Sequence, residues 1–117
     1  MPKNKEATRY FSTMQEEHVA KLIGGHRSAN SGAATFSAGD VYEREASILV
    51  ECKTPMTEKG SFSIKKSWLD KNKEEAFSLR LSNHALAFEF GPEQKNYFVI
   101  DEKLFAFLCE KLREENA

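Results

Sequence analysis

The segment 47–53, Ser-Ile-Leu-Val-Glu-Cys-Lys, constrains the possible folds of this chain more than any other. Its run of branched apolar residues predicts a β-strand with buried side chains. A short strand pattern at 40–42 and a polar turn at 43–46 precede it, so the two strands are expected to form a hairpin. A sheet is therefore predicted at the centre of the fold.

The rest of the chain alternates between helical and strand patterns. In chain order we expect a helix at 12–23, a loop with one short strand at 26–39, the hairpin, a helix at about 64–77 with Ser63 as its N-cap, strands at 85–90 and 97–100, and a final helix that Asp101 caps. Gly24-Gly25 is expected to end the first helix, and Gly91-Pro92 to turn between the last two strands. The order α-β-β-β-α-β-β-α predicts an α/β or α+β domain with a central mixed sheet flanked by helices.

Length and charge limit the classes of protein. A chain of 117 residues suits one domain, 1–117, of which about 1–10 are expected to be disordered. No stretch approaches the roughly 18 apolar residues of a membrane span, and the polar N-terminus predicts no secretory signal, so we expect a cytoplasmic protein with no membrane partner. The net charge of −1 means that DNA binding would have to depend on local charge. Cys52 and Cys109 are expected to be buried, reduced thiols.

Three charged residues of the hairpin form a candidate site. Residues two apart in a strand point to the same face, so Glu51 and Lys53 project together while Cys52 points to the other face. Asp40 opens the preceding strand, and the hairpin brings its carboxylate beside Glu51. Neighbouring carboxylates repel each other unless a cation neutralises them, and Mg²⁺ typically binds one or two carboxylates with several waters. Asp40 and Glu51 are therefore candidate Mg²⁺ ligands.

Such a site suits hydrolysis of a phosphodiester. A metal ion would polarise the phosphoryl oxygen and lower the pKa of a bound water, and Lys53 could orient that water or stabilise developing negative charge. The alternative is a solvated hairpin with alternating charges. The apolar run 48–50 that leads into Glu51 argues against that alternative.

These residues and two further motifs have a familiar order and spacing. Gly39-Asp40-Val41 is followed, eleven residues after the aspartate, by Glu51-Cys52-Lys53. Gln15-Glu16-Glu17 lies on the first helix, and the stretch 27–33 reads Arg-Ser-Ala-Asn-Ser-Gly-Ala. The set resembles the D-x(n)-E-x-K core of the PD-(D/E)xK nuclease superfamily, with Gly39 in place of the proline. The two upstream motifs resemble those of its archaeal and phage Holliday-junction resolvases.

The resemblance implies a restriction-endonuclease-like fold and a Mg²⁺-dependent endonuclease of branched DNA. It implies that Mn²⁺ can substitute, that no organic cofactor takes part, and that the protein is a homodimer, because a four-way junction needs two symmetric incisions. The aromatics Phe88, Phe105 and Phe107 exceed what one small core needs and are compatible with a dimer interface.

The resemblance also implies an acidic residue from the first helix. Val19, Ala20 and Ile23 lie three, four and seven residues after Glu16, so Glu16 shares the inward stripe and Glu17 is more exposed. We therefore expect Glu16 to join Asp40 and Glu51 as a metal ligand. The alternative role for Glu16 is a first-turn carboxylate that the helix dipole favours.

Candidate DNA contacts lie on both sides of the hairpin. Ser31 could bind the scissile phosphate or a metal-bound water, as the resemblance implies, or could simply belong to a turn. Arg27 and Ser28 are candidate contacts to a neighbouring phosphate, or an exposed loop. Lys59, Lys65 and Lys66 would add positive charge beside the site. The acidic residues Asp70, Glu74 and Glu75 favour instead a solvated helix face for that region.

The main interpretation is thus a structure-selective DNA endonuclease with Asp40, Glu51, Lys53, Glu16 and Ser31 as its catalytic residues. One alternative is a nuclease of the same superfamily that cuts linear or single-stranded DNA. Another is a DNA-binding module without catalytic activity, although the acidic residues and the lysine are all present.

Overall fold

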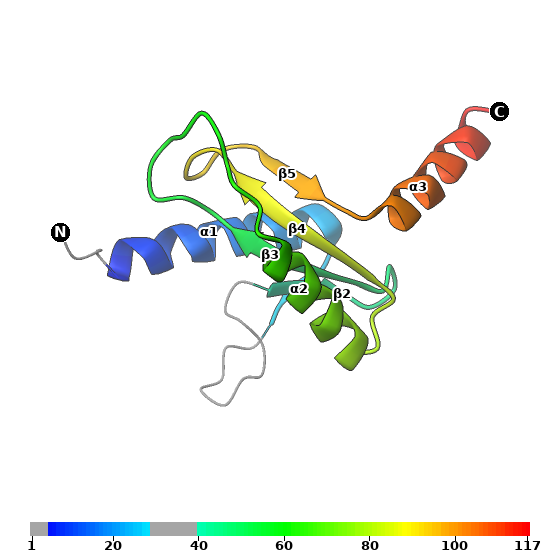
Figure 1. Ribbon diagram of the computed structural model, residues 1–117, viewed down its shortest axis with the longest axis horizontal. Coiled ribbons are helices and arrows are strands. Elements are labelled where there is room, and N and C mark those ends of the chain that lie inside the picture. The colour runs from blue at the N-terminus through cyan, green and yellow to red at the C-terminus, as the bar shows by residue number, and fades with distance from the viewer. Residues whose placement is uncertain (1–4, 29–39) are drawn as a thin grey trace.

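The protein is an α/β domain in which one five-stranded sheet lies among three helices (Figure 1). The computed structural model describes residues 5–28 and 40–117. In chain order its elements are α1 (Lys5–Ile23), β1 (His26–Arg27), β2 (Asp40–Glu43), β3 (Ile48–Lys53), α2 (Lys66–Ser78), β4 (Asn83–Glu89), β5 (Asn96–Val99) and α3 (Glu102–Glu115). The predicted element order is confirmed.

The sheet is mixed, as predicted, and its strands follow one another in the order β1-β2-β3-β4-β5. Strands β3 and β4 are parallel, and the other neighbouring pairs are antiparallel. Helix α2 makes the crossover between the two parallel strands. They need a long connection because the C-terminal end of β3 and the N-terminal end of β4 lie at opposite ends of the strands. The β2–β3 hairpin places Asp40 directly opposite Glu51.

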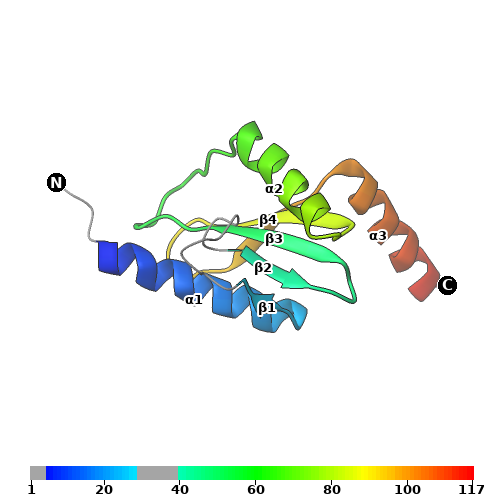
Figure 2. The same ribbon diagram turned by 90° about the horizontal axis from the view of Figure 1, so that it is seen from below.

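The two faces of the sheet bury different apolar sets. On one face Val41, Val50, Ala85 and Ala87 pack against Val19 of α1. On the other face Leu49 packs with two residues that α2 and its C-terminal turn supply, Ala76 and Leu81. Figure 2 shows α1 and α2 on opposite sides of the strands. Strand alternation therefore decides whether a side chain of β2 or β3 meets α1 or α2.

Helix α1 is longer than the sequence pattern predicted. It begins at Lys5, seven residues before the expected start at position 12. Its C-terminus is where the two glycines predict it. Gly24 adopts the left-handed conformation with φ of 69°, and the Gly25 N–H donates to the Ala20 carbonyl at 2.8 Å. Gly25 also lies so close to the Tyr42 carbonyl that a Cβ could not fit there.

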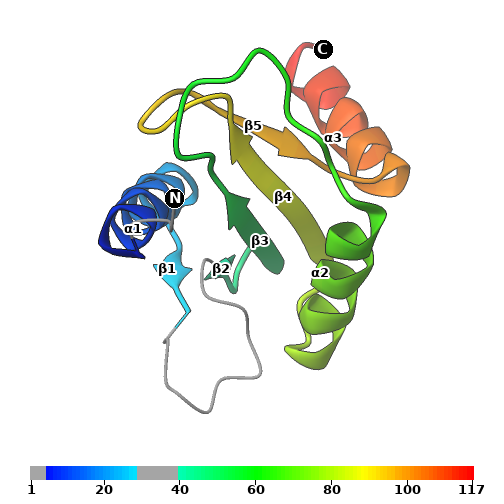
Figure 3. The same ribbon diagram turned by 60° about the vertical axis from the view of Figure 1, so that its left-hand side comes forward.

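The other two helices begin differently. Ser63 does not cap α2, so that prediction was wrong: Lys65 is the N-cap residue, and no side chain there accepts a bond from the first turn. Asp101 does cap α3, accepting a bond from the Leu104 N–H at 2.9 Å. No residue of α3 is buried, and the helix projects beyond the end of β5 (Figures 1 and 3).

Both cysteines are free thiols, as expected, although they are half-buried rather than buried. Cys52 faces the α1 side of the sheet, where burial raises the pKa of its thiol. Within the described residues, no helix is long and apolar enough to cross a membrane.

Candidate active site

Asp40 and Glu51 form a buried pair of carboxylates on the α2 face of the sheet. They are register partners in the antiparallel β2–β3 hairpin, so their side chains project from the same face. Asp40 is 1 % exposed and Glu51 is 3 % exposed. The expected juxtaposition of these two residues is therefore present.

The oxygens of this pair lack the partners that buried carboxylates need. Neither side-chain oxygen of Asp40 has a hydrogen-bond partner among the described residues, nor does Oε1 of Glu51. Oε2 of Glu51 lies 3.2 Å from Nζ of Lys53. An ionised carboxylate buried without a donor is strongly unfavourable, so this spot either holds protons or receives a cation.

Glu75 of α2 is a third carboxylate at this spot, and the sequence analysis missed it. Both of its side-chain oxygens are buried without a donor among the described residues. Its carboxyl lies beside that of Asp40 and raises the pKa of Asp40. The neighbouring positions Asn72 and Ala76 are buried against the sheet, and Glu75 follows Asn72 by three residues, on the same side of the helix. The prediction of a solvated helix face for Glu75, together with Asp70 and Glu74, is therefore wrong at Glu75.

The environment of Asp40 favours its protonated form. Burial, followed by the hydrogen bond to and the charge of Glu75, and then the charge of Glu51, raises the pKa of Asp40 to about 8. The charge of Lys71 acts in the opposite direction. Near neutral pH this pKa favours a protonated Asp40.

Lys53 presents an ammonium group at the edge of this cluster. Its side chain is one-third exposed, and besides the ion pair with Glu51 its Nζ lies 4.5 Å from the centre of the Trp68 ring. Nζ of Lys65 lies 5.6 Å from the same ring. Trp68 also packs near Phe62, with ring centres 6.3 Å apart. Trp68 is therefore a positioning contact for Lys53 that sequence alone did not indicate.

Gln15 of α1 binds the backbone carbonyl of Lys53, a role that the sequence did not reveal. Nε2 of Gln15 donates to the Lys53 carbonyl at 2.9 Å and to Oδ1 of Asn96 at 2.9 Å. It also lies 3.3 Å from the Ala87 carbonyl. One buried amide thus joins α1 to three strands at the end of β3.

Glu16 is not brought to the pair of carboxylates. As helix phase predicted, it is buried and Glu17 is exposed. However, α1 covers the opposite face of the sheet, and Oε1 of Glu16 pairs with Nε of Arg27 at 3.0 Å. Burial raises the pKa of Glu16, and the hydrogen bond and charge of Arg27 oppose that rise. The role of Glu16 as a metal ligand stays a prediction.

The segment before β2 reaches the site in part. The Ser28 N–H donates to the Asp40 carbonyl at 2.9 Å, which continues the β1–β2 register to the position opposite Asp40. Ser31 lies outside the described residues. Arg27 forms the ion pair with Glu16 described above, and its contact with a phosphate stays a prediction.

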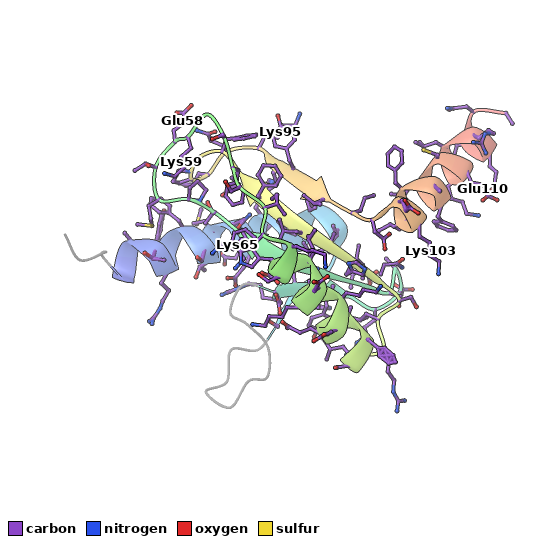
Figure 4. The ribbon with its side chains drawn as sticks, in the orientation of Figure 1. Glu58, Lys59, Lys65, Lys95, Lys103 and Glu110 are labelled. Carbon is purple, nitrogen blue, oxygen red and sulfur yellow. The ribbon has the colours of Figure 1, made fainter. Side chains whose placement is uncertain are left out.

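The three candidate lysines after β3 are all exposed and spread out. Figure 4 shows Lys59 near the tip of the loop between β3 and α2, and Lys65 at the start of α2. Nζ of Lys66 forms an ion pair at 2.9 Å with Asp70, one turn later on α2. Only Lys65 therefore stands next to Lys53, through the shared Trp68 ring.

The register leaves the other acidic residues of the hairpin outside the cluster. Glu43 closes the turn by accepting bonds from the backbone N–H groups of Glu45, at 3.2 Å, and Ala46, at 2.5 Å. Glu45 is exposed in that turn. The site acid on β2 is thus Asp40.

The donor set suits a hard divalent cation, because it consists of carboxylate oxygens without other partners. In residues 5–28 and 40–117, no three His, Cys, Asp or Glu side chains already have the arrangement of a metal site. Asp40, Glu51 and Glu75 would thus have to move closer together to share one ion. Comparisons with protein-family models, curated proteins and solved structures find no match for this chain.

Proposed function

We propose that this chain is a metal-dependent DNA endonuclease with a restriction-endonuclease-like fold, of the PD-(D/E)xK type, that cuts branched DNA. One observation carries the proposal. Asp40 and Glu51 lie opposite each other, nearly inaccessible and with unpartnered oxygens, beside the ammonium of Lys53. A buried carboxylate with a purely structural role normally accepts hydrogen bonds from protein donors, and both oxygens of Asp40 and Oε1 of Glu51 lack such donors among the described residues.

The residues present can divide the work of phosphodiester hydrolysis. A bound Mg²⁺, or Mn²⁺ in its place, would supply positive charge at the phosphoryl oxygen and a water of lowered pKa. Asp40 and Glu51 would hold that ion. The Lys53 ammonium, one-third exposed, would stabilise the negative charge that develops while the water oxygen bonds to phosphorus and the bond to the leaving sugar oxygen breaks. The attacking water would release its proton to solvent and the leaving oxygen would take one up from solvent, so the protons balance.

The start of α2 supports binding of a DNA phosphate next to this point. The helix N-terminus has no side-chain cap, and free N–H groups at such a terminus attract anions. Lys53 and Lys65 face the same Trp68 ring there. These contacts would bind the phosphate backbone without reading bases, so they fit a protein that selects DNA by shape.

A homodimer belongs to the proposal, and α3 offers a surface for it. Phe105 is 60 % exposed and Leu112 is 62 % exposed, and both lie on a helix with no buried residue. Tyr97 and Phe98 add exposed aromatic surface on the edge strand β5. An apolar helix face that its own chain leaves uncovered fits a two-fold contact with a second copy. Two copies would bring two sites to one junction.

The test incubates the purified protein with an end-labelled four-way junction and with a linear duplex of the same sequence, with Mg²⁺ or with EDTA. We expect paired cuts in the junction that require Mg²⁺ and disappear in Glu51→Gln and Lys53→Met. The matched control is Glu58→Gln, an exposed glutamate on the loop after β3 (Figure 4), which should cut normally.

Other outcomes distinguish the remaining functions. Equal cutting of duplex or single-stranded DNA would keep the nuclease and remove the junction specificity. A folded protein that binds DNA but cuts none of these substrates would contradict the nuclease and leave a binding module.

A further inference from the structure

The cluster on the α2 face contains one carboxylate more than the hairpin supplies. Both oxygens of Glu75 are buried, and no donor among the described residues reaches them. Asp40, the neighbouring carboxylate, is 1 % exposed and also has two unpartnered oxygens. Asp40 thus has a carboxylate neighbour on each side, Glu51 of β3 and Glu75 of α2, where the described protein atoms supply one ion pair, from Lys53 to Glu51.

We propose that Glu75 is a third carboxylate ligand of the divalent cation, so that the ion joins α2 to the β2–β3 hairpin. This inference rests on the proposed function, since it uses the same ion. Its physical basis is the absence of a compensating donor. Lys71 is exposed and acts on Asp40 only through its charge, and Asp40 has no hydrogen bond from it.

The contacts of α2 with the sheet hold the backbone of Glu75 in place. The helix docks through the Asn72 amide, whose Nδ2 donates to the Ala85 carbonyl at 2.8 Å. Ala76, directly after Glu75, packs on Leu49 of β3. Glu75 therefore lies between two buried anchors of α2 and over the hairpin. A cation between the two carboxyl groups would supply the positive charge that the described protein atoms around their oxygens do not provide.

Such an ion couples the helix to the sheet. Because α2 begins at the uncapped terminus near Lys65 and Trp68, ordering α2 would also fix the proposed phosphate contact. Binding of the cation would thus prepare the surface that receives DNA, and part of the binding free energy would appear as stability of α2.

The first experiment measures binding of Mn²⁺ alone by isothermal titration calorimetry at pH 8, without DNA. We expect Glu75→Gln to weaken binding at least about 10-fold, as loss of a ligand does, and Asp40→Asn to weaken it as well. Glu74→Gln is the matched control, because Glu74 is the exposed neighbour on the same helix, and it should bind like the wild type.

The outcomes separate the inference from the proposed function. If Glu75→Gln binds Mn²⁺ like the wild type while Asp40→Asn does not, Glu75 is no ligand and the hairpin site stands. If the wild type binds no Mn²⁺, both are overturned.

A second measurement needs no variant and remains decisive if Glu75→Gln fails to fold. Hydrogen exchange of the wild-type backbone is followed with and without saturating Mg²⁺. We expect amides of α2 to exchange more slowly with the ion, while those of α3, which is remote from the site, keep their rates. Unchanged exchange in α2 would contradict the coupling.

Discussion

Asp40→Asn should stabilise the metal-free protein, although the same change should remove a residue essential for the proposed activity. Asn is nearly isosteric with Asp and stays neutral at every pH of interest. In the folded protein, burial together with Glu75 and Glu51 raises the pKa of Asp40 to about 8, whereas in an unfolded chain the pKa of Asp40 has its ordinary value of 3.8. Folding near neutral pH therefore requires that Asp40 take up a proton or be buried as a charge.

The sign and size follow from proton linkage. Between pH 4 and 8 the folded state binds the proton and the unfolded state does not, so stability decreases as the pH rises, by about 1.4 kcal/mol per pH unit. Below pH 4 both states are protonated and the penalty vanishes. At pH 7 the substitution should thus raise the free energy of unfolding by on the order of 2–4 kcal/mol, and by much less at pH 5.

The assay is urea unfolding in EDTA at pH 5, 7 and 8, followed by circular dichroism. Asp70→Asn is the control, because Asp70 is an exposed residue of α2 in an ion pair with Lys66, and it should leave the pH dependence unchanged. An Asp40→Asn protein whose stability and pH dependence match the wild type would refute the raised pKa of the buried Asp40.

Three further perturbations test the parts around the cluster. Gln15→Ala should lower the free energy of unfolding by about 2–3 kcal/mol, since it leaves three acceptors of the sheet without their buried donor; urea unfolding measures this, and an unchanged midpoint would contradict it. Trp68→Leu should slow junction cutting about 5-fold by releasing the Lys53 ammonium, at a cation–π value of about 1 kcal/mol; single-turnover rates measure it, and wild-type rates would show that the ring does not position Lys53. Phe105→Glu should convert a dimer to a monomer in sedimentation, while Phe77→Glu, at an exposed position of α2, should not; a dimer that survives the first change would exclude this face.

The hairpin and its carboxylates could be predicted because they depend on local pattern. The alternation in 47–53 indicates which residues share a face, and a hairpin brings the start of β2 close to the end of β3. The exact register of Asp40 with Glu51 comes from the structure, in which Glu43 belongs to β2 and the turn spans 44–47. The extension of α1 to Lys5 was missed because Ser12 and Thr13 look like a helix start. Both lie inside the helix, where tertiary packing outweighs their preference for caps.

The roles of Glu16 and Glu75 depended on which face of the sheet each helix covers. Helix phase showed that Glu16 points inward, but not that α1 lies on the face away from Asp40. Arg27, its partner, lies on a strand of two residues, too short for a sequence pattern to reveal. Glu75 looked solvated because its neighbours are charged, and only the docking of α2 through Asn72 turns it toward the hairpin.

The most direct test of the central claim is a crystal structure of the protein with Mn²⁺, with data collected near the manganese absorption edge. If a cation site is present at the hairpin, the map should contain one strong anomalous peak within ligand distance of Asp40 and Glu51, with Glu75 turned toward it. Anomalous peaks elsewhere, with Asp40 and Glu51 left in contact only with protein atoms, would contradict the claim that these buried carboxylates form a cation site.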